Sequence, residues 1–104
     1  MILLNVITKK EEEIEKLIHH VLKNKYSKSV QLDHEIFFNL DENGKIIEIK
    51  TPKISFITKA LLYKEIEDSI FGIIHHEEII IYAIPVGSMN EQYGNELRKF
   101  IKAA

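Results

Sequence analysis

Apolar and polar residues follow two different periods along this chain, and each change of period marks an expected element. Ile2 to Ile7 is apolar on both faces, which is typical of a short buried strand. From Ile14 to Leu22 the apolar residues recur every three or four positions, which predicts a helix with one apolar stripe. Thr8 stands three residues before Glu11, the spacing of a capping box. The chain is therefore predicted to begin as a strand followed by a capped helix.

The next segment has the pattern of a β-hairpin. Five apolar residues share one parity and predict a half-buried strand: Val30, Leu32, Ile36, Phe38 and Leu40. Asn43-Gly44 predicts the turn, because this pair accepts the positive φ values of tight hairpins. Pro52 cannot donate a hydrogen bond to a neighbouring strand, so the returning strand is expected to bulge or bend there before it resumes at 54–58.

Three further elements complete the pattern. Helical spacing returns from Ala60 to about Ile74, and Ile79 to Ile84 is again a strand that is apolar on both faces. A short last helix is expected from its apolar stripe of Tyr93, Leu97, Phe100 and Ile101. The order β-α-β-β-α-β, then a helix, predicts one α+β domain over 1–104. Its expected architecture is a ferredoxin-like four-stranded antiparallel sheet with both crossover helices on one face.

The two strands that are apolar on both sides do not fit a single chain. Two helices cover only one face of such a sheet, so the other face needs a second covering layer. Another copy of the same chain is the most economical cover. We therefore expect a homo-oligomer.

Composition narrows the classes of function. The chain has 104 residues and a net charge of −2, and Arg98 is its one arginine, so a nucleic-acid partner is not expected. No apolar run approaches the ~18–20 residues that span a bilayer, so no membrane partner is expected. The first residues lack the basic start of a signal peptide, which favours a cytoplasmic location. Cysteine is absent, which excludes thiolate metal sites and cysteine nucleophiles.

The densest group of metal-ligand residue types is His75-His76-Glu77, followed by Glu78. Imidazole and carboxylate together suit a divalent ion such as zinc or copper. Adjacent side chains rarely point at one ion, so a second chain is expected to complete the coordination shell. The alternative interpretation is a solvated connector between the second helix and the last strand.

The remaining polar residues favour structural roles. His19-His20 lies toward the C-terminal end of the first helix, where the helix dipole favours a cationic imidazole. His34 shares the core-side parity of its strand, so it is either buried with a hydrogen-bond partner or marks a break in the strand. Glu11-Glu12-Glu13 is predicted to be a solvated first helical turn. No catalytic motif is present, so the chain is not expected to be an enzyme.

The chain resembles the CutA family of small trimeric proteins named for divalent-cation tolerance. The resemblance covers nearly the whole chain and rests on segments that follow the family order: Lys28-Ser29-Val30-Gln31, Asn43-Gly44-Lys45, Thr58-Lys59, His75-His76-Glu77, Ile84-Pro85-Val86 and Asn90-Glu91-Gln92-Tyr93. It implies a homotrimer that either binds zinc or copper weakly or serves as an assembly and signalling scaffold in the response to divalent metals.

The chain departs from the family pattern at three places. Ser29 replaces the usual cysteine, the Trp-Trp pair before the hairpin is missing near Leu40-Asp41-Glu42, and the Pro-Tyr after the histidines is lost. The chain is therefore expected to be a divergent member. The alternative is a PII-like trimeric sensor that binds a small anionic ligand at subunit clefts. PII-like proteins carry a long flexible loop between the second and third strands, whereas a tight turn is predicted here.

Overall fold

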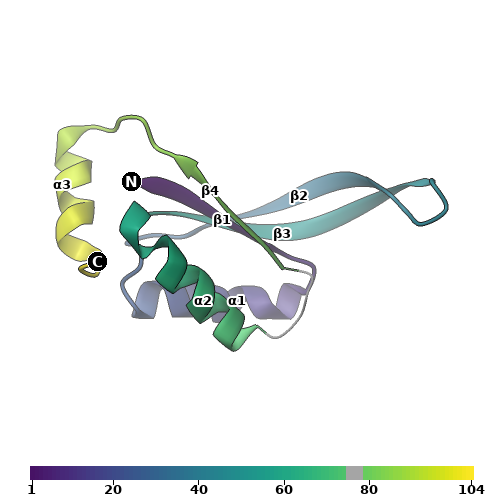
Figure 1. Ribbon diagram of the computed structural model, residues 1–104, viewed down its shortest axis with the longest axis horizontal. Coiled ribbons are helices and arrows are strands. Elements are labelled where there is room, and N and C mark those ends of the chain that lie inside the picture. Colours follow the sequence, from purple (N-terminus) through teal and green to yellow (C-terminus); the bar gives the residue numbers. More distant parts are fainter. Residues whose placement is uncertain (75–78) are drawn as a thin grey trace.

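The computed structural model describes residues 1–74 and 79–104 (Figure 1). Its elements are β1 (Ile2–Thr8), a 3-10 turn (Glu11–Glu13), α1 (Ile14–Lys23), β2 (Gln31–Leu40), β3 (Ile46–Thr58), a second 3-10 turn (Ala60–Leu62), α2 (Tyr63–Ile73), β4 (Ile79–Pro85) and α3 (Glu91–Phe100). The predicted order β-α-β-β-α-β with a terminal helix is confirmed.

The four strands form one sheet in the order β2-β3-β1-β4, and every neighbouring pair is antiparallel. Both α1 and α2 lie on the same face of this sheet, while α3 stands at its end, near the two termini (Figure 1). This is the predicted ferredoxin-like α+β architecture. The face opposite α1 and α2, called here the open face, has no helix layer among the described elements (Figure 1).

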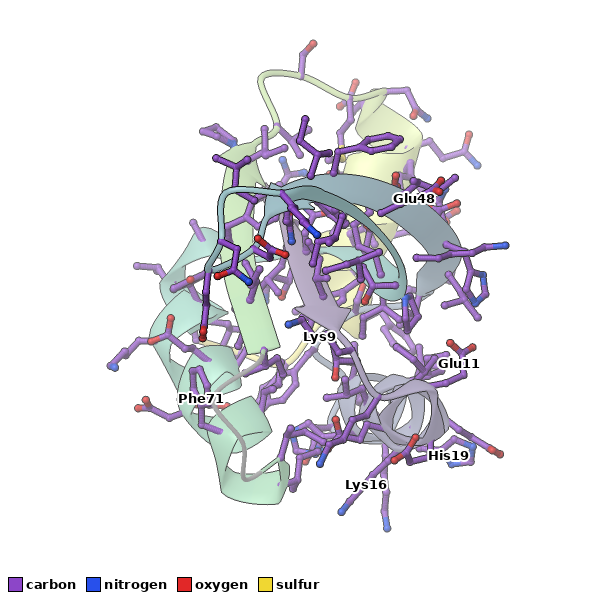
Figure 2. The ribbon with its side chains drawn as sticks, turned by 90° about the vertical axis from the view of Figure 1, so that its right-hand side faces the viewer. Lys9, Glu11, Lys16, His19, Glu48 and Phe71 are labelled. Carbon is purple, nitrogen blue, oxygen red and sulfur yellow. The ribbon has the colours of Figure 1, made fainter. Side chains whose placement is uncertain are left out.

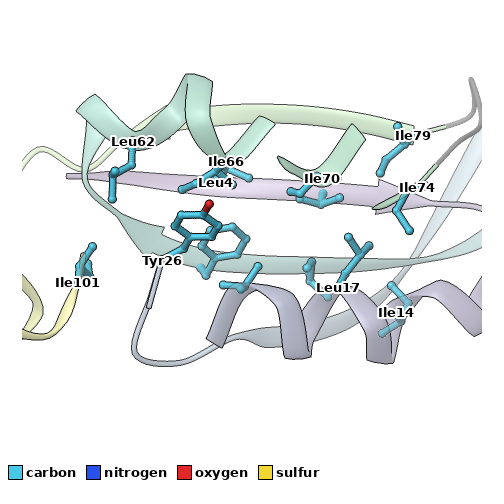
Figure 3. Close-up of a cluster of buried hydrophobic side chains, with 14 of the residues drawn as sticks. Leu4, Ile14, Leu17, Tyr26, Leu62, Ile66, Ile70, Ile74, Ile79 and Ile101 are labelled. Carbon is cyan, nitrogen blue, oxygen red and sulfur yellow. The ribbon is translucent and has the colours of Figure 1, made fainter. Parts of the chain in front are cut away.

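The core lies between the sheet and the two crossover helices (Figure 3). Alternate residues of β1 and β3 point toward the helices, and Leu4, Val6 and Ile54 are fully buried there. The predicted stripes of α1 and α2 meet them, since helical residues three and four apart share one face. The buried stripe residues are Ile14, Leu17 and Val21 of α1, with Leu62, Ile66, Ile70 and Ile74 at and around α2.

The predicted turn between β2 and β3 is confirmed. Gly44 has φ +77°, and the Asp41 carboxylate accepts hydrogen bonds from the Asn43 and Lys45 backbone N–H groups at 2.9 and 2.8 Å. Among the described residues, only Lys25 and Gly44 have positive φ, so Asn43 does not use the conformation expected of it. The connection is short, unlike the long loop of the PII-like alternative.

The predicted interruption at Pro52 is wrong. Strand β3 is continuous, and Pro52 pairs with His34 of β2 without an inserted residue. Pairing between β1 and β3 ends at Lys53, so Pro52 has a neighbouring strand on one side only, where a proline is tolerated. The Thr51 hydroxyl donates to the Thr8 carbonyl at 2.6 Å, so a side chain supplies a hydrogen bond where that pairing stops.

The capping box predicted between Thr8 and Glu11 is also wrong, because Thr8 contacts Glu13 instead of Glu11. The Thr8 hydroxyl donates to the Glu13 carboxylate at 2.9 Å and accepts from the Lys10 backbone N–H at 3.3 Å. A 3-10 turn delays α1 to Ile14 and brings Glu13, rather than Glu11, next to Thr8. Glu11 instead lies 3.0 Å from His34, so the acidic run is only partly a solvated turn.

Candidate functional site

The predicted metal ligands His75, His76 and Glu77 lie outside the described residues, which omit 75–78. The residues on either side of this segment are anchored in the core. Ile74, directly after α2, is 2% exposed, and Ile79, the first residue of β4, is 8% exposed. The segment therefore joins two ends that are held firmly by packing.

Neither histidine of α1 forms part of a described metal site. His20 has both ring nitrogens occupied, since Nε2 lies 2.9 Å from the Ser69 hydroxyl and Nδ1 lies 3.3 Å from the Asn24 amide nitrogen. Burial lowers the pKa of His20 from its ordinary value, so the cationic form expected from the helix dipole is disfavoured. His19 is exposed and lies with Lys16 on the side of α1 turned away from the sheet (Figure 2).

His34 is neither buried nor at a break in its strand. Its side chain is 44% exposed, and Nε2 lies 3.0 Å from a carboxylate oxygen of Glu11. This pair offers two donors, whereas a metal site needs three or four. Within residues 1–74 and 79–104, no three His, Cys, Asp or Glu side chains are grouped closely enough to hold an ion.

The β4 side of the open face is apolar. Ile80, Tyr82 and Ile84 point away from the helices and are 40–55% exposed. Their partners in the register on β1 are Ile7, Asn5 and Leu3. The two-sided apolar character predicted for the first and last strands is therefore observed, and the β4 edge leaves large apolar side chains uncovered in the single chain.

The middle of the open face is polar and already paired. The Ser55 hydroxyl donates to the Asn5 amide oxygen at 2.7 Å, and both residues are buried. Lys53 forms an ion pair with Glu35 on β2 at 3.0 Å. The hydrogen bond to Glu35 raises the pKa of Lys53, against a smaller opposing effect of burial. These contacts satisfy the central polar groups and leave the apolar edge as the exposed part.

A second apolar surface runs along the β2–β3 hairpin, and its β2 residues have the parity that was predicted to be half-buried. It consists of Ile36, Phe38, Leu40 and Ile46, which are 54–73% exposed and are called here the hairpin strip. The cause is length. A 10-residue helix such as α1 is about 15 Å long, whereas the 13 residues of β3 extend about 43 Å. The hairpin therefore projects past both helices (Figure 1).

This projection enlarges the whole molecule. A compact chain of 104 residues has a radius of gyration of about 13 Å, whereas this chain has 15.0 Å. A compact monomer of 12.2 kDa exposes about 6,100 Å², whereas this chain exposes 6811 Å². The single chain is more extended than an ordinary monomer of its size, and the projecting part carries the hairpin strip. No helix in the described residues is both long and apolar enough to cross a membrane.

A hollow of about 210 Å³, lined by polar and apolar side chains in similar measure, lies where the open face meets α3. Ser29, which stands at the usual cysteine position of the CutA pattern, lines it together with Gln31, Ser55 and Tyr93. Hydroxyl and amide groups replace any thiolate here. The hollow therefore offers hydrogen bonds rather than a soft metal ligand.

Comparison with solved structures places this arrangement among known folds. CutA1 from Pyrococcus horikoshii is 26% identical, with a TM-score of 0.85 over 99% of this chain and 100% of that one. The periplasmic divalent cation tolerance protein CutA from Archaeoglobus fulgidus is 19% identical, with a TM-score of 0.81 over 98% of this chain and 100% of that one. CutA1 from Oryza sativa is 14% identical, with a TM-score of 0.81 over 99% of this chain and 94% of that one. No family model and no curated protein sequence matches the chain. The resemblance predicted from the sequence segments is confirmed.

Proposed function

The chain is a CutA-like protein, and on that premise we propose that it is a homotrimer with a non-enzymatic role in divalent metal tolerance or response. The similar proteins from A. fulgidus and Thermus thermophilus are named for divalent cation tolerance. We further propose that zinc or copper binds weakly at His75, His76 and Glu77. The hairpin strip is the observation that carries the assembly, and the donor types at 75–77 carry the metal proposal.

Assembly into a trimer would cover two surfaces that one chain leaves bare. The hairpin strip and the β4 edge are both apolar, and stable monomers rarely expose large contiguous apolar areas. A second copy of the chain is the favoured cover, because every copy carries both the hairpin strip and the β4 edge. Obligate interfaces of this kind commonly bury more than about 2,000 Å² in total. The enlarged surface of the single chain supports this proposal.

The metal proposal rests on donor chemistry. Two imidazoles and a carboxylate fit Zn²⁺ or Cu²⁺. Cu(I) is not expected to bind well, because it prefers soft sulfur ligands and the chain has no cysteine. Because neighbouring side chains diverge, we propose that the shell is shared between protomers or completed by water. The described histidines are weaker candidates, since His20 and His34 already have hydrogen-bond partners.

Calorimetric titration of the protein with Zn²⁺ and Cu²⁺ at pH 7.5 tests the metal proposal. The wild type should bind, and affinity should weaken as the pH falls through about 6.5, because the donors are neutral imidazoles. The double variant His75→Ala/His76→Ala should lose uptake and keep its oligomeric mass. The variant His19→Ala, at an exposed histidine, should bind as the wild type does.

Flat heats with the wild type would end the metal proposal in favour of the solvated connector. Equal binding by the wild type and the double variant would move the site to His19, His20 or His34. Neither result would touch the assembly proposal, which depends on other residues.

We also propose a cytoplasmic location. The similar protein from A. fulgidus is named periplasmic, which differs from this proposal. Fractionation of the source cells separates the two locations, and recovery from the periplasmic fraction would contradict ours.

A further inference from the structure

His20 links the two crossover helices. It lies in the last turn of α1, and its ring is half-buried against Ser69 of α2, with 2.9 Å between Nε2 and the Ser69 hydroxyl oxygen. On another side the ring meets Tyr26 edge to face, with the ring centres 5.8 Å apart. Asn24, directly after the helix, closes the third side. The ring is therefore held by α2 and by the segment that directly follows α1.

The surrounding hydrogen bonds fix the protonation of this ring. The Ser69 hydroxyl donates to the Ile66 carbonyl at 2.8 Å, so its oxygen accepts the hydrogen of His20 Nε2. The Asn24 amide nitrogen lies 2.8 Å from the His20 carbonyl oxygen and 3.3 Å from Nδ1, and it donates to both. Nδ1 therefore carries a lone pair. The neutral Nε2–H form satisfies every polar group in the contact.

Protonation of Nδ1 would place two donors against each other. Turning the Asn24 amide over would not relieve this, because its oxygen would then face the His20 carbonyl oxygen. The Asn24 backbone N–H also bonds that carbonyl at 3.2 Å, so the disturbed contact is the C-terminal cap of α1.

The charged groups around His20 do not compensate a positive ring. Lys16 and Lys23 line the same hollow beside it on α1. Beyond Tyr26, Lys102 of the C-terminal segment is paired with Glu65 of α2. Among the described residues, no carboxylate forms an ion pair with the ring.

We propose that His20 is a pH-sensitive clasp between α1 and α2, closed by its neutral imidazole and opened when Nδ1 takes a proton. This goes beyond the proposed metal function and does not depend on it. Burial lowers the pKa of His20 in the folded chain below the ordinary 6.5, so the folded form binds fewer protons than the unfolded one. The stabilisation is therefore complete above pH 6.5 and is lost as the pH falls through the folded pKa.

Two measurements test the clasp. Long-range ¹H–¹⁵N spectra of the wild type between pH 8 and 5 should show His20 as the Nε2–H tautomer, with a titration midpoint below 6.5. Urea unfolding over the same range should show a midpoint that falls in acid for the wild type. His20→Gln, which keeps a neutral donor, should show a smaller fall, and the control His19→Gln should follow the wild type.

Titration of His20 at or above pH 6.5, or an Nδ1–H tautomer, would overturn the proposal. An unchanged acid dependence in His20→Gln would overturn it as well. The spectra need only the wild type, so the test holds even where the variant folds poorly.

Discussion

Replacing Phe38 with aspartate is expected to convert the proposed trimer into single chains at micromolar concentration. Phe38 lies in the middle of the hairpin strip and is 70% exposed in the single chain, so Phe38→Asp leaves the fold of one chain nearly unaffected. In the proposed trimer the same position is covered, and an unpaired buried carboxylate strongly opposes association. Light scattering should report a mass near 12.2 kDa for the variant and three times that mass for the wild type.

Asn43→Asp is the matched control for this substitution. It adds the same charge to the same hairpin, but at the exposed turn, outside the strip residues. It should remain a trimer, with a circular dichroism spectrum equal to those of the wild type and Phe38→Asp. A wild type that scatters as a single chain would contradict the assembly. A Phe38→Asp variant that stays trimeric would remove the hairpin strip from the interface.

Replacing Leu62 with alanine is expected to lower the free energy of unfolding by about 2–5 kcal/mol. Leu62 ends the 3-10 turn before α2 and is 2% exposed in the core (Figure 3). Removing its side chain loses the transfer free energy of the buried carbons and leaves a cavity that the packed neighbours fill only in part. Urea unfolding at one fixed protein concentration measures the change, since oligomer stability depends on concentration.

The preceding residue provides an unusually close control. Leu61 has the same side chain and is 86% exposed, so Leu61→Ala should change the free energy of unfolding by no more than about 0.5 kcal/mol. Similar losses at both positions would mean that Leu61 is covered in the assembly or that the packing of α2 differs from the structure. Comparing the two variants in the Phe38→Asp background separates these explanations.

Periodicity was sufficient to predict the parts of the fold that pack against each other. The stripe of Ile14, Leu17 and Val21 predicts both the helix and its buried face, because spacing along the chain decides which side chains share a face. The partners of individual polar side chains were not predictable in this way. Glu13 replaced Glu11 as the partner of Thr8 because a 3-10 turn shifted the start of the helix.

Burial was the property that the sequence pattern predicted least well. The alternation of Ile36 and Phe38 is that of a half-buried strand, yet both are exposed in the single chain. Comparing the expected lengths of the strands and helices would have indicated this exposure, because a long hairpin extends beyond the ends of short helices. Pro52 misled for a related reason, because its effect depends on where the neighbouring strand ends. The segment His75-His76-Glu77 lies outside the described residues, so the metal ligands stay a prediction.

Native mass spectrometry with and without added Zn²⁺ and Cu²⁺ tests the central proposal most directly, because one spectrum reports both the number of chains and the bound metal. The account predicts a species of three 12.2 kDa chains that gains metal mass on addition of either ion. The His75→Ala/His76→Ala variant should give the same three-chain species without that gain. A spectrum of single chains that retain no metal would contradict both parts of the account.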